Sequence, residues 1–233
     1  MIRCNEITKE ILSYADPAAA AHAQKFFKTG KGEYGEGDIF IGLTSPQVRG
    51  IVKKYYKEVD LEDLEKLLHD PRHEMRSVAL LIMVERFEKG MGKEEIFDLY
   101  IKNVKYINNW DLVDISCYKI AGRKCFEDKN YEVLDRLASS NHLWSERIAV
   151  VSNMYLLKRG DFTKVKEYAV KFLNHEHDLM HKAIGWMLRE MGKMDEKELV
   201  DFLDKYSKKL PRTALRYAIE KLTPEQRKLY MAK

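Results

Sequence analysis

The stretch LWSERIAVV, Leu143–Val151, decides the fold class, because segments of the same design recur along the chain. Each segment opens an apolar stretch of helical spacing, with a basic residue near its start and a small residue one to three positions later. The other copies are HEMRSVALL at His73–Leu81, LMHKAIGWM at Leu179–Met187 and PRTALRYA at Pro211–Ala218. Arg76 and Arg147 lie 71 residues apart and Arg147 and Lys182 lie 35 apart, which indicates a unit of about 35 residues.

Each copy follows another amphipathic segment, so the repeating unit is a pair of helices. The stretch Asn108–Gly122 supplies the copy expected between Arg76 and Arg147. The segments predicted as first helices are Leu61–Leu68, Glu94–Val104, Tyr131–Ala138, Val165–Leu173 and Glu198–Tyr206. Helix pairs at this period predict an all-α fold, an α-solenoid of HEAT-like pairs with a concave groove. We expect one such domain over residues 1–233, with N-terminal helices and a loop in 1–57 and the repeats in 58–233.

The N-terminal part combines helices with a glycine-rich loop. Residues 1–28 have helical spacing, and Asp16 before Pro17 marks the start of the second helix. Thr29–Asp38 contains four glycines and is predicted to be a loop. It lacks the Lys-Ser/Thr ending of a phosphate-binding P-loop, which excludes that kind of nucleotide site. The apolar run Ile39–Leu43 is predicted to enter the core, and Thr44 or Ser45 before Pro46 to begin another helix.

Composition fits a globular protein of the cytoplasm. The chain has 233 residues, of which 45% are hydrophobic and 33% charged, and no apolar run reaches the length of about 18 residues that spans a membrane. The N-terminus lacks the apolar segment of a signal peptide, and the three cysteines form no disulfide or metal pattern. The net charge of +4 permits nucleic-acid binding if the cations share a surface.

Trp110 and Asp114 are the first candidate site residues. They are four residues apart on a predicted helix, so an aromatic plane and a carboxylate share one face. Such a pair suits an enzyme that stabilises a positively charged group. The structural alternative is that Trp110 anchors the core and Asp114 is a solvated helix residue.

Matching positions of a solenoid lie on one surface, which brings further residues to the same face. We expect Arg147, Trp186 and Arg189 to converge there with Trp110 and Asp114. The cations predicted to extend this face as a positive stripe are Arg76, Lys182, Lys208, Lys209, Arg212 and Arg216. A concave positive face predicts a groove for duplex DNA.

Three ordered segments resemble the AlkD-like family of DNA alkylation repair glycosylases. They are NWDLVD at Asn109–Asp114, LWSERIA at Leu143–Ala149 and KAIGWMLRE at Lys182–Glu190, and the resemblance runs from about Ala18 to Leu222. By position it implies that Asp114 is the catalytic carboxylate, that two indoles flank the lesion and that Arg147 contacts the DNA backbone. It also implies excision of N3- or N7-alkylated purines, such as 3-methyladenine and 7-methylguanine, without flipping the base into a protein pocket. The loop of residues 29–38 is longer than the family pattern.

The chemistry fits those roles. A cationic purine leaves as a neutral base, so positive charge moves to the deoxyribose in the transition state. A carboxylate about 4 Å from that sugar contributes about 4 kcal/mol at an effective dielectric constant near 20, and the indole faces of Trp110 and Trp186 add about 0.5–2 kcal/mol each through cation–π attraction. Arg147 either holds a phosphate or pairs with Asp114 or Glu146. Asp111 either supports Asp114 or interacts with the helix dipole.

Other chemistries have less support in the sequence. His177 and His181 have the i,i+4 spacing of a zinc pair, but Asp178 stands where the motif needs a glutamate, so a polar turn is expected instead. We therefore expect a glycosylase without metal or nucleotide cofactor, acting as a monomer on double-stranded DNA with no obligate protein partner. The alternative is a non-catalytic HEAT-like module that binds nucleic acid or protein.

Overall fold

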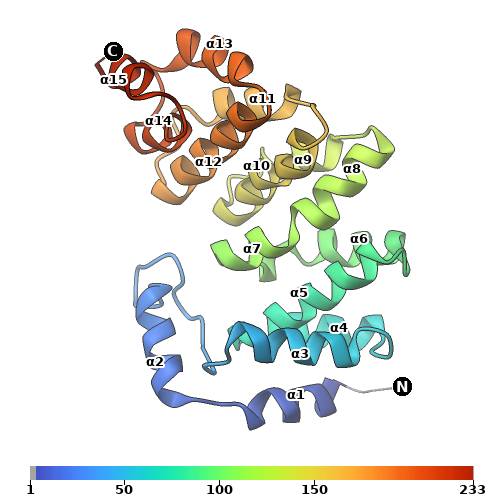
Figure 1. Ribbon diagram of the computed structural model, residues 1–233. Helices are drawn as coiled ribbons and strands as arrows, with labels where there is room; N and C mark the ends of the chain where they lie inside the picture. Colours follow the sequence, from blue (N-terminus) through green and yellow to red (C-terminus); the bar gives the residue numbers. More distant parts are fainter. Residues whose placement is uncertain (1–3, 233) are drawn as a thin grey trace. The chain divides into compact units, whose positions relative to one another are not determined.

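A computed structural model describes residues 4–232, and within them the regular structure is helical apart from one isolated bridge between Ile39 and Arg72 (Figure 1). Residues 1–3, the start of the helical segment predicted for 1–28, and residue 233 lie outside the described part. The chain divides into two compact units, which we call unit 1 (Met1–Ile120) and unit 2 (Ala121–Lys233). The predicted single domain stays a prediction.

Unit 1 is built around one buried helix, α5. Its helices are α1 (Cys4–Ser13), α2 (Pro17–Phe26), α3 (Ser45–Tyr55), α4 (Leu61–Leu68), α5 (His73–Glu88), α6 (Lys93–Lys102) and α7 (Trp110–Ser116), with a 3₁₀ turn, η1, at Val104–Tyr106. Helix α5 packs against α3, α4, α6 and α7. Because neighbours cover most of its surface, apolar residues such as Met75, Leu80 and Phe87 are fully buried on several sides. A π-helical turn, η2 (Tyr118–Gly122), follows α7.

Unit 2 has two central helices, α10 and α12. Its helices are α8 (Arg123–Asp128), α9 (Glu132–Leu137), α10 (Leu143–Leu157), α11 (Thr163–Lys171), α12 (Asp178–Met194), α13 (Glu196–Tyr206), α14 (Arg212–Ala218) and α15 (Pro224–Ala232). Helix α12 packs against α10, α11, α13 and α14. The approach to α14 requires a glycine, because a Cβ on Gly185 would lie 2.5 Å from both the carbonyl oxygen of Ala214 and Cβ of Tyr217. Close helix contacts of this kind fix the register of one pair on the next.

The predicted helix-pair repeat is confirmed. The second helices of the pairs, α5, α7, α10, α12 and α14, begin at residues 73, 110, 143, 178 and 212, at intervals of 33 to 37 residues. The first helices, α4, α6, α9, α11 and α13, begin within two residues of their predicted starts. The all-α class with HEAT-like helix pairs is therefore the fold of this chain.

The N-terminal signals also fold as predicted, with one exception. Asp16 accepts hydrogen bonds from the amides of Ala18 and Ala19 at 2.9 and 3.0 Å and so caps α2. Thr44 precedes α3, and its amide donates to the side chain of Gln47 at 2.7 Å. The run 39–43 enters the core only in part, since Ile39 is 48% exposed. Phe40 and Ile41 are the residues of this run that enter the core, at 8% and 7% exposed, whereas Ile39 contacts the start of α5 through its backbone, its carbonyl accepting from the amide of His73 at 2.7 Å.

Candidate active site

The site begins at the N-terminus of α7, which Asn109 caps. The Asn109 side chain accepts a hydrogen bond from the Trp110 amide at 2.8 Å, and its Nδ2 donates to Asp38 at 3.2 Å. Asn109 is fully buried, so both ends of its amide are used inside unit 1. Since the first turn of α7 is thereby fixed, the directions of Trp110 and of the residues one turn further are fixed as well.

Trp110 is half-buried in an aromatic cluster. Its indole stacks on Phe27 with centroids 5.1 Å apart and an interplanar angle of 22°, and the ring of Phe26 meets it edge-on at 6.0 Å. The indole Nε1 donates to the hydroxyl of Tyr34 at 3.3 Å. The ring is therefore held in one orientation by contacts on one face and at its polar edge.

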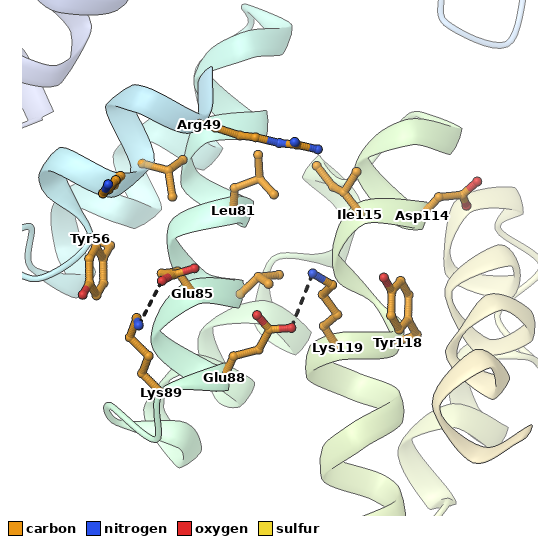
Figure 2. Close-up of a pocket in the computed structure, with 13 residues that line it drawn as sticks. Arg49, Tyr56, Leu81, Glu85, Glu88, Lys89, Asp114, Ile115, Tyr118 and Lys119 are labelled. Atoms are coloured by element: carbon orange, nitrogen blue, oxygen red, sulfur yellow. Dashed lines mark ion pairs between the residues drawn. The ribbon is translucent and has the colours of Figure 1, made fainter. Parts of the chain in front are cut away.

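Asp114, one turn further along α7, is half-buried on the wall of a cavity of about 620 Å³ that lies in unit 1. Figure 2 shows Asp114, Ile115 and Tyr118 along the same stretch of chain, with Arg49 extending from α3 toward Ile115. The charged residues that line this cavity are Arg49, Lys53, Lys89, Lys119, Glu85, Glu88 and Asp114. Lys89 pairs with Glu85 at 3.3 Å and Lys119 with Glu88 at 3.4 Å. The lining thus holds four cations and three carboxylates, of which Glu85 and Glu88 are paired with lysines, and this slightly positive balance suits a cationic group attached to phosphates.

A buried ionic network lies behind the start of α7. His73 is flanked by two carboxylates, with Nδ1 2.8 Å from Asp38 and Nε2 2.8 Å from Asp111. Burial lowers the pKa of His73, but the hydrogen bonds to Asp111 and Asp38 outweigh burial and raise that pKa to about 9, so the imidazole carries a proton at neutral pH. For the carboxyl of Asp38, burial raises the pKa. The contacts with His73, Arg76 and Asn109 outweigh burial and hold this pKa below its usual value.

This network was not found from the sequence. The sequence predicts that Asp111 interacts with the helix dipole or supports Asp114, whereas its Oδ2 contacts His73, 38 residues earlier in the chain. Helical periodicity reports which residues share a helix face, and it carries no signal for a contact between a loop, α5 and α7.

Arg76 lies in the same network and not on an open surface. It is 5% exposed and forms an ion pair with Asp38, and its Nη1 donates to the carbonyl of Asp70 at 3.4 Å. Its guanidinium therefore neutralises a buried carboxylate within unit 1. For this reason the positive stripe predicted from the repeat does not include Arg76.

In unit 2, Arg147 occupies a comparable position at the start of α10. It is 5% exposed, and its Nη1 donates to the carbonyl of Leu179 in α12 at 2.7 Å. Its neighbour Glu146 contacts His175 at 3.0 Å. Arg147 thus ties α10 to the first turn of α12, a structural role that leaves its predicted phosphate contact a prediction.

Helix α12 carries Lys182, Trp186 and Arg189 at the i, i+4 and i+7 positions of one face, and all three are half-buried. Lys182 pairs with Asp178 at 2.8 Å, and Arg189 forms an ion pair with Glu220. An indole between two cationic side chains is a surface on which a nucleotide can be held by stacking and by charge.

The remaining predicted cations of unit 2 lie on the surface around α14. The exposed residues are Lys208, Lys209, Arg212 and Arg216, and Arg212 also donates to the carbonyl of Met231 at 3.2 Å.

Of the other residues considered for the site, Trp144 is buried in the core. Trp110 and Asp114 belong to unit 1, whereas Arg147, Trp186 and Arg189 belong to unit 2, and their convergence stays a prediction.

The histidines singled out in the sequence serve the turn between α11 and α12. His177 caps α12, with Nδ1 accepting from the amide of Leu179 at 3.1 Å. In residues 4–232 no group of three or more His, Cys, Asp or Glu side chains is arranged to hold a metal ion. The helices of that same range include none with the length and apolar character needed to cross a membrane.

The comparisons with known proteins agree with the fold. A family model described as DNA alkylation repair enzyme matches residues 7–222. A solved structure described as a predicted DNA alkylation repair enzyme from Enterococcus faecalis superposes with a TM-score of 0.72 at 19% sequence identity, covering 90% of this chain and 97% of that one. No curated protein matches the chain. Because the family model spans nearly the whole sequence, the chain belongs to the family of DNA alkylation repair enzymes.

Proposed function

We propose that the protein is a DNA glycosylase that removes cationic N3- or N7-alkylated purines from double-stranded DNA. The observation that carries this proposal is the placement of Asp114, which is half-buried on the wall of a cavity that is also lined by Arg49, Lys53, Lys89 and Lys119. A scaffold that only binds DNA gains nothing from an acid at that position, because a carboxylate repels the phosphates. A glycosylase gains stabilisation of the positive sugar.

In the proposed reaction the alkylated base leaves as a neutral purine and the deoxyribose becomes an oxocarbenium-like cation. Asp114 stabilises this cation and orients the attacking water, whose proton is lost to solvent or to the carboxylate as the new C–O bond forms. The Trp110 indole, one turn earlier on α7, offers a π face to the cationic nucleotide. This chemistry requires no metal and no nucleotide cofactor, and it does not require the base to enter a protein pocket.

The second indole, Trp186, and the cations Lys182 and Arg189 of α12 are proposed to hold the DNA on unit 2. The exposed cations Lys208, Lys209, Arg212 and Arg216 extend that surface. We also retain the proposals that the protein acts as a monomer and in the cytoplasm.

The test is release of 7-methylguanine from methylated duplex DNA under single-turnover conditions by wild type and by Asp114→Asn. Replacing a carboxylate about 4 Å from the sugar by an amide removes roughly 3–4 kcal/mol of transition-state stabilisation, which corresponds to a loss of about 100- to 1000-fold in rate. Asp98→Asn, an exposed acid on α6, serves as the matched control and should keep the wild-type rate.

Equal rates for wild type and Asp114→Asn would remove the catalytic assignment. The absence of release by wild type, together with intact binding to duplex DNA, would favour the alternative of a non-catalytic HEAT-like binding module.

A further inference from the structure

The glycine-rich loop, residues 29–38, folds back onto the end of α2 and reaches the start of α7. Gly35 makes this possible, because a Cβ there would lie 2.5 Å from the carbonyl oxygen of Phe27, and the Gly35 amide donates to the carbonyl of Lys28 at 3.1 Å. The loop acids Glu33 and Glu36 accept hydrogen bonds from loop amides at 3.0 and 2.8 Å. The loop is therefore a folded element with its own internal bonds.

Two side chains of this loop contact the first turn of α7. The hydroxyl of Tyr34 accepts the indole N–H of Trp110 at 3.3 Å and lies 3.5 Å from the carbonyl oxygen of Phe26, to which it donates. Asp38, which is 3% exposed, accepts from Nδ2 of Asn109 at 3.2 Å. The loop thus holds both the residue that caps α7 and the indole that follows it.

A third contact passes through α5. His73 bridges Asp38 and Asp111 with 2.8 Å contacts on each side. Consequently the cap residue Asn109 and the first two residues of α7, Trp110 and Asp111, all form hydrogen bonds with the loop, directly or through one histidine. Asp114 lies one turn beyond them, so its direction depends on the same anchoring.

We propose that the glycine-rich loop is a positioning element for the reacting centre and that Tyr34 is its principal positioning residue, since it sets the orientation of the Trp110 indole. This inference rests on the proposed glycosylase function for its kinetic readout only. The geometry points to the loop because a ring stacked on Phe27 alone can slide in its own plane, whereas a hydrogen bond at its polar edge removes that freedom.

The experiment compares Tyr34→Phe with wild type by three measurements. The first is the indole N–H resonance of Trp110 in a ¹⁵N–¹H spectrum, identified by its loss in Trp110→Phe. The second is the split between kcat and KM for 7-methylguanine release. The third is the melting temperature. Tyr14→Phe, which removes the hydroxyl of a tyrosine that is 40% exposed elsewhere in unit 1, is the matched control.

Tyr34→Phe is expected to shift the Trp110 indole resonance and to speed its exchange with solvent. Loss of one positioning hydrogen bond is expected to lower kcat by about twofold to tenfold, with KM and melting temperature near wild type. An unchanged resonance together with an unchanged kcat overturns the proposal. So does a fall in activity that only follows the fraction of folded protein.

A second variant tests the loop without touching the hydroxyl. Gly35→Ala places a methyl group against the carbonyl of Phe27 and displaces the loop from α2, so the Trp110 resonance should shift in this variant too. Gly50→Ala, at a helical position with open space around it, is its control. If wild type releases no base, the proposed function fails, and the indole resonance still decides whether Tyr34 positions Trp110.

Discussion

The buried network of His73, Asp38 and Asp111 predicts how stability depends on pH. Replacing Asp111 by Asn removes one of the two carboxylates that flank the imidazole while keeping the size of the side chain. The His73 side chain is 4% exposed, and that of Asp111 is 24% exposed. Because both partners are largely shielded from solvent, we expect a stability effect larger than that of a surface ion pair.

The magnitude follows from the pKa of His73, which is raised from 6.5 to about 9. At about 1.4 kcal/mol for each tenfold change in proton affinity, the protonated form stabilises the fold by about 3 kcal/mol. The folded pKa lies above the unfolded pKa, so this contribution is complete below pH 6.5 and is lost as pH rises toward 9. The pKa of Asp38 is lowered on folding, so the stability that its ionised carboxylate contributes is present at neutral pH. This stability is lost only in acid, as pH falls below the ordinary pKa of 3.8.

Urea unfolding of wild type and Asp111→Asn at pH 6, 7.5 and 9.5 measures this effect as a difference, in which other titrating groups cancel. The variant is expected to be less stable by about 1–2 kcal/mol at pH 6, where a hydrogen bond to a charged group is lost, and nearly equal to wild type at pH 9.5. NMR titration of the His73 ring should show a lower midpoint in the variant. Stability curves that stay parallel over this range would refute the reasoning, because they would mean that His73 does not titrate in contact with Asp111. Asp98→Asn is the control whose curve should run parallel to wild type.

Two further predictions concern unit 2. Gly185→Ala places a Cβ 2.5 Å from the carbonyl oxygen of Ala214, so this variant should have a free energy of unfolding lower by about 1–3 kcal/mol, measured by denaturant unfolding. A variant as stable as wild type would contradict the close approach of α12 and α14. The affinity for duplex DNA should fall steeply as the salt concentration rises. Replacing Lys209 and Arg216 by Ala should reduce the slope of log Kd against log salt concentration by about two, which fluorescence anisotropy at several salt concentrations measures. An unchanged slope would exclude these two cations from the DNA-binding surface.

The repeat could be predicted from the sequence because it rests on local signals. Asp16 with Pro17 and Thr44 with Pro46 begin helices for reasons contained within four residues. The helix pairs recur because each must bury one apolar face against the next, which imprints the period on the residues themselves. The helix predicted at Asn108–Gly122 is shorter than expected, since α7 ends at Ser116 and the π-helical turn η2 follows. A π-helical turn inserts one residue into the helical repeat, and periodicity does not reveal where that happens.

The buried arginines show why the site was harder to predict than the fold. Arg76 and Arg147 occupy matching repeat positions, and this pattern indicated a shared positive surface. In the structure each guanidinium instead reaches the carbonyl of a residue outside its own helix, Asp70 for Arg76 and Leu179 for Arg147. A guanidinium can donate to a backbone carbonyl as well as to a phosphate, and the sequence spacing is the same in both cases.

Whether an arginine at a matching repeat position has a structural role or binds DNA depends on the groups that surround it. Arg76 has a structural role because the glycine-rich loop brings Asp38 to it. The same loop binds the cap and the indole of α7 through Asp38 and Tyr34. A loop that supplies one carboxylate to an arginine and a histidine therefore also constrains the helix that carries Asp114, and stability and positioning become properties of one network. It follows that Asp38→Asn should disturb both together, whereas Tyr34→Phe should alter the indole and leave the pH dependence of stability unchanged. Separate measurement of these two effects distinguishes a loop that orients the catalytic helix from one that only holds unit 1 together.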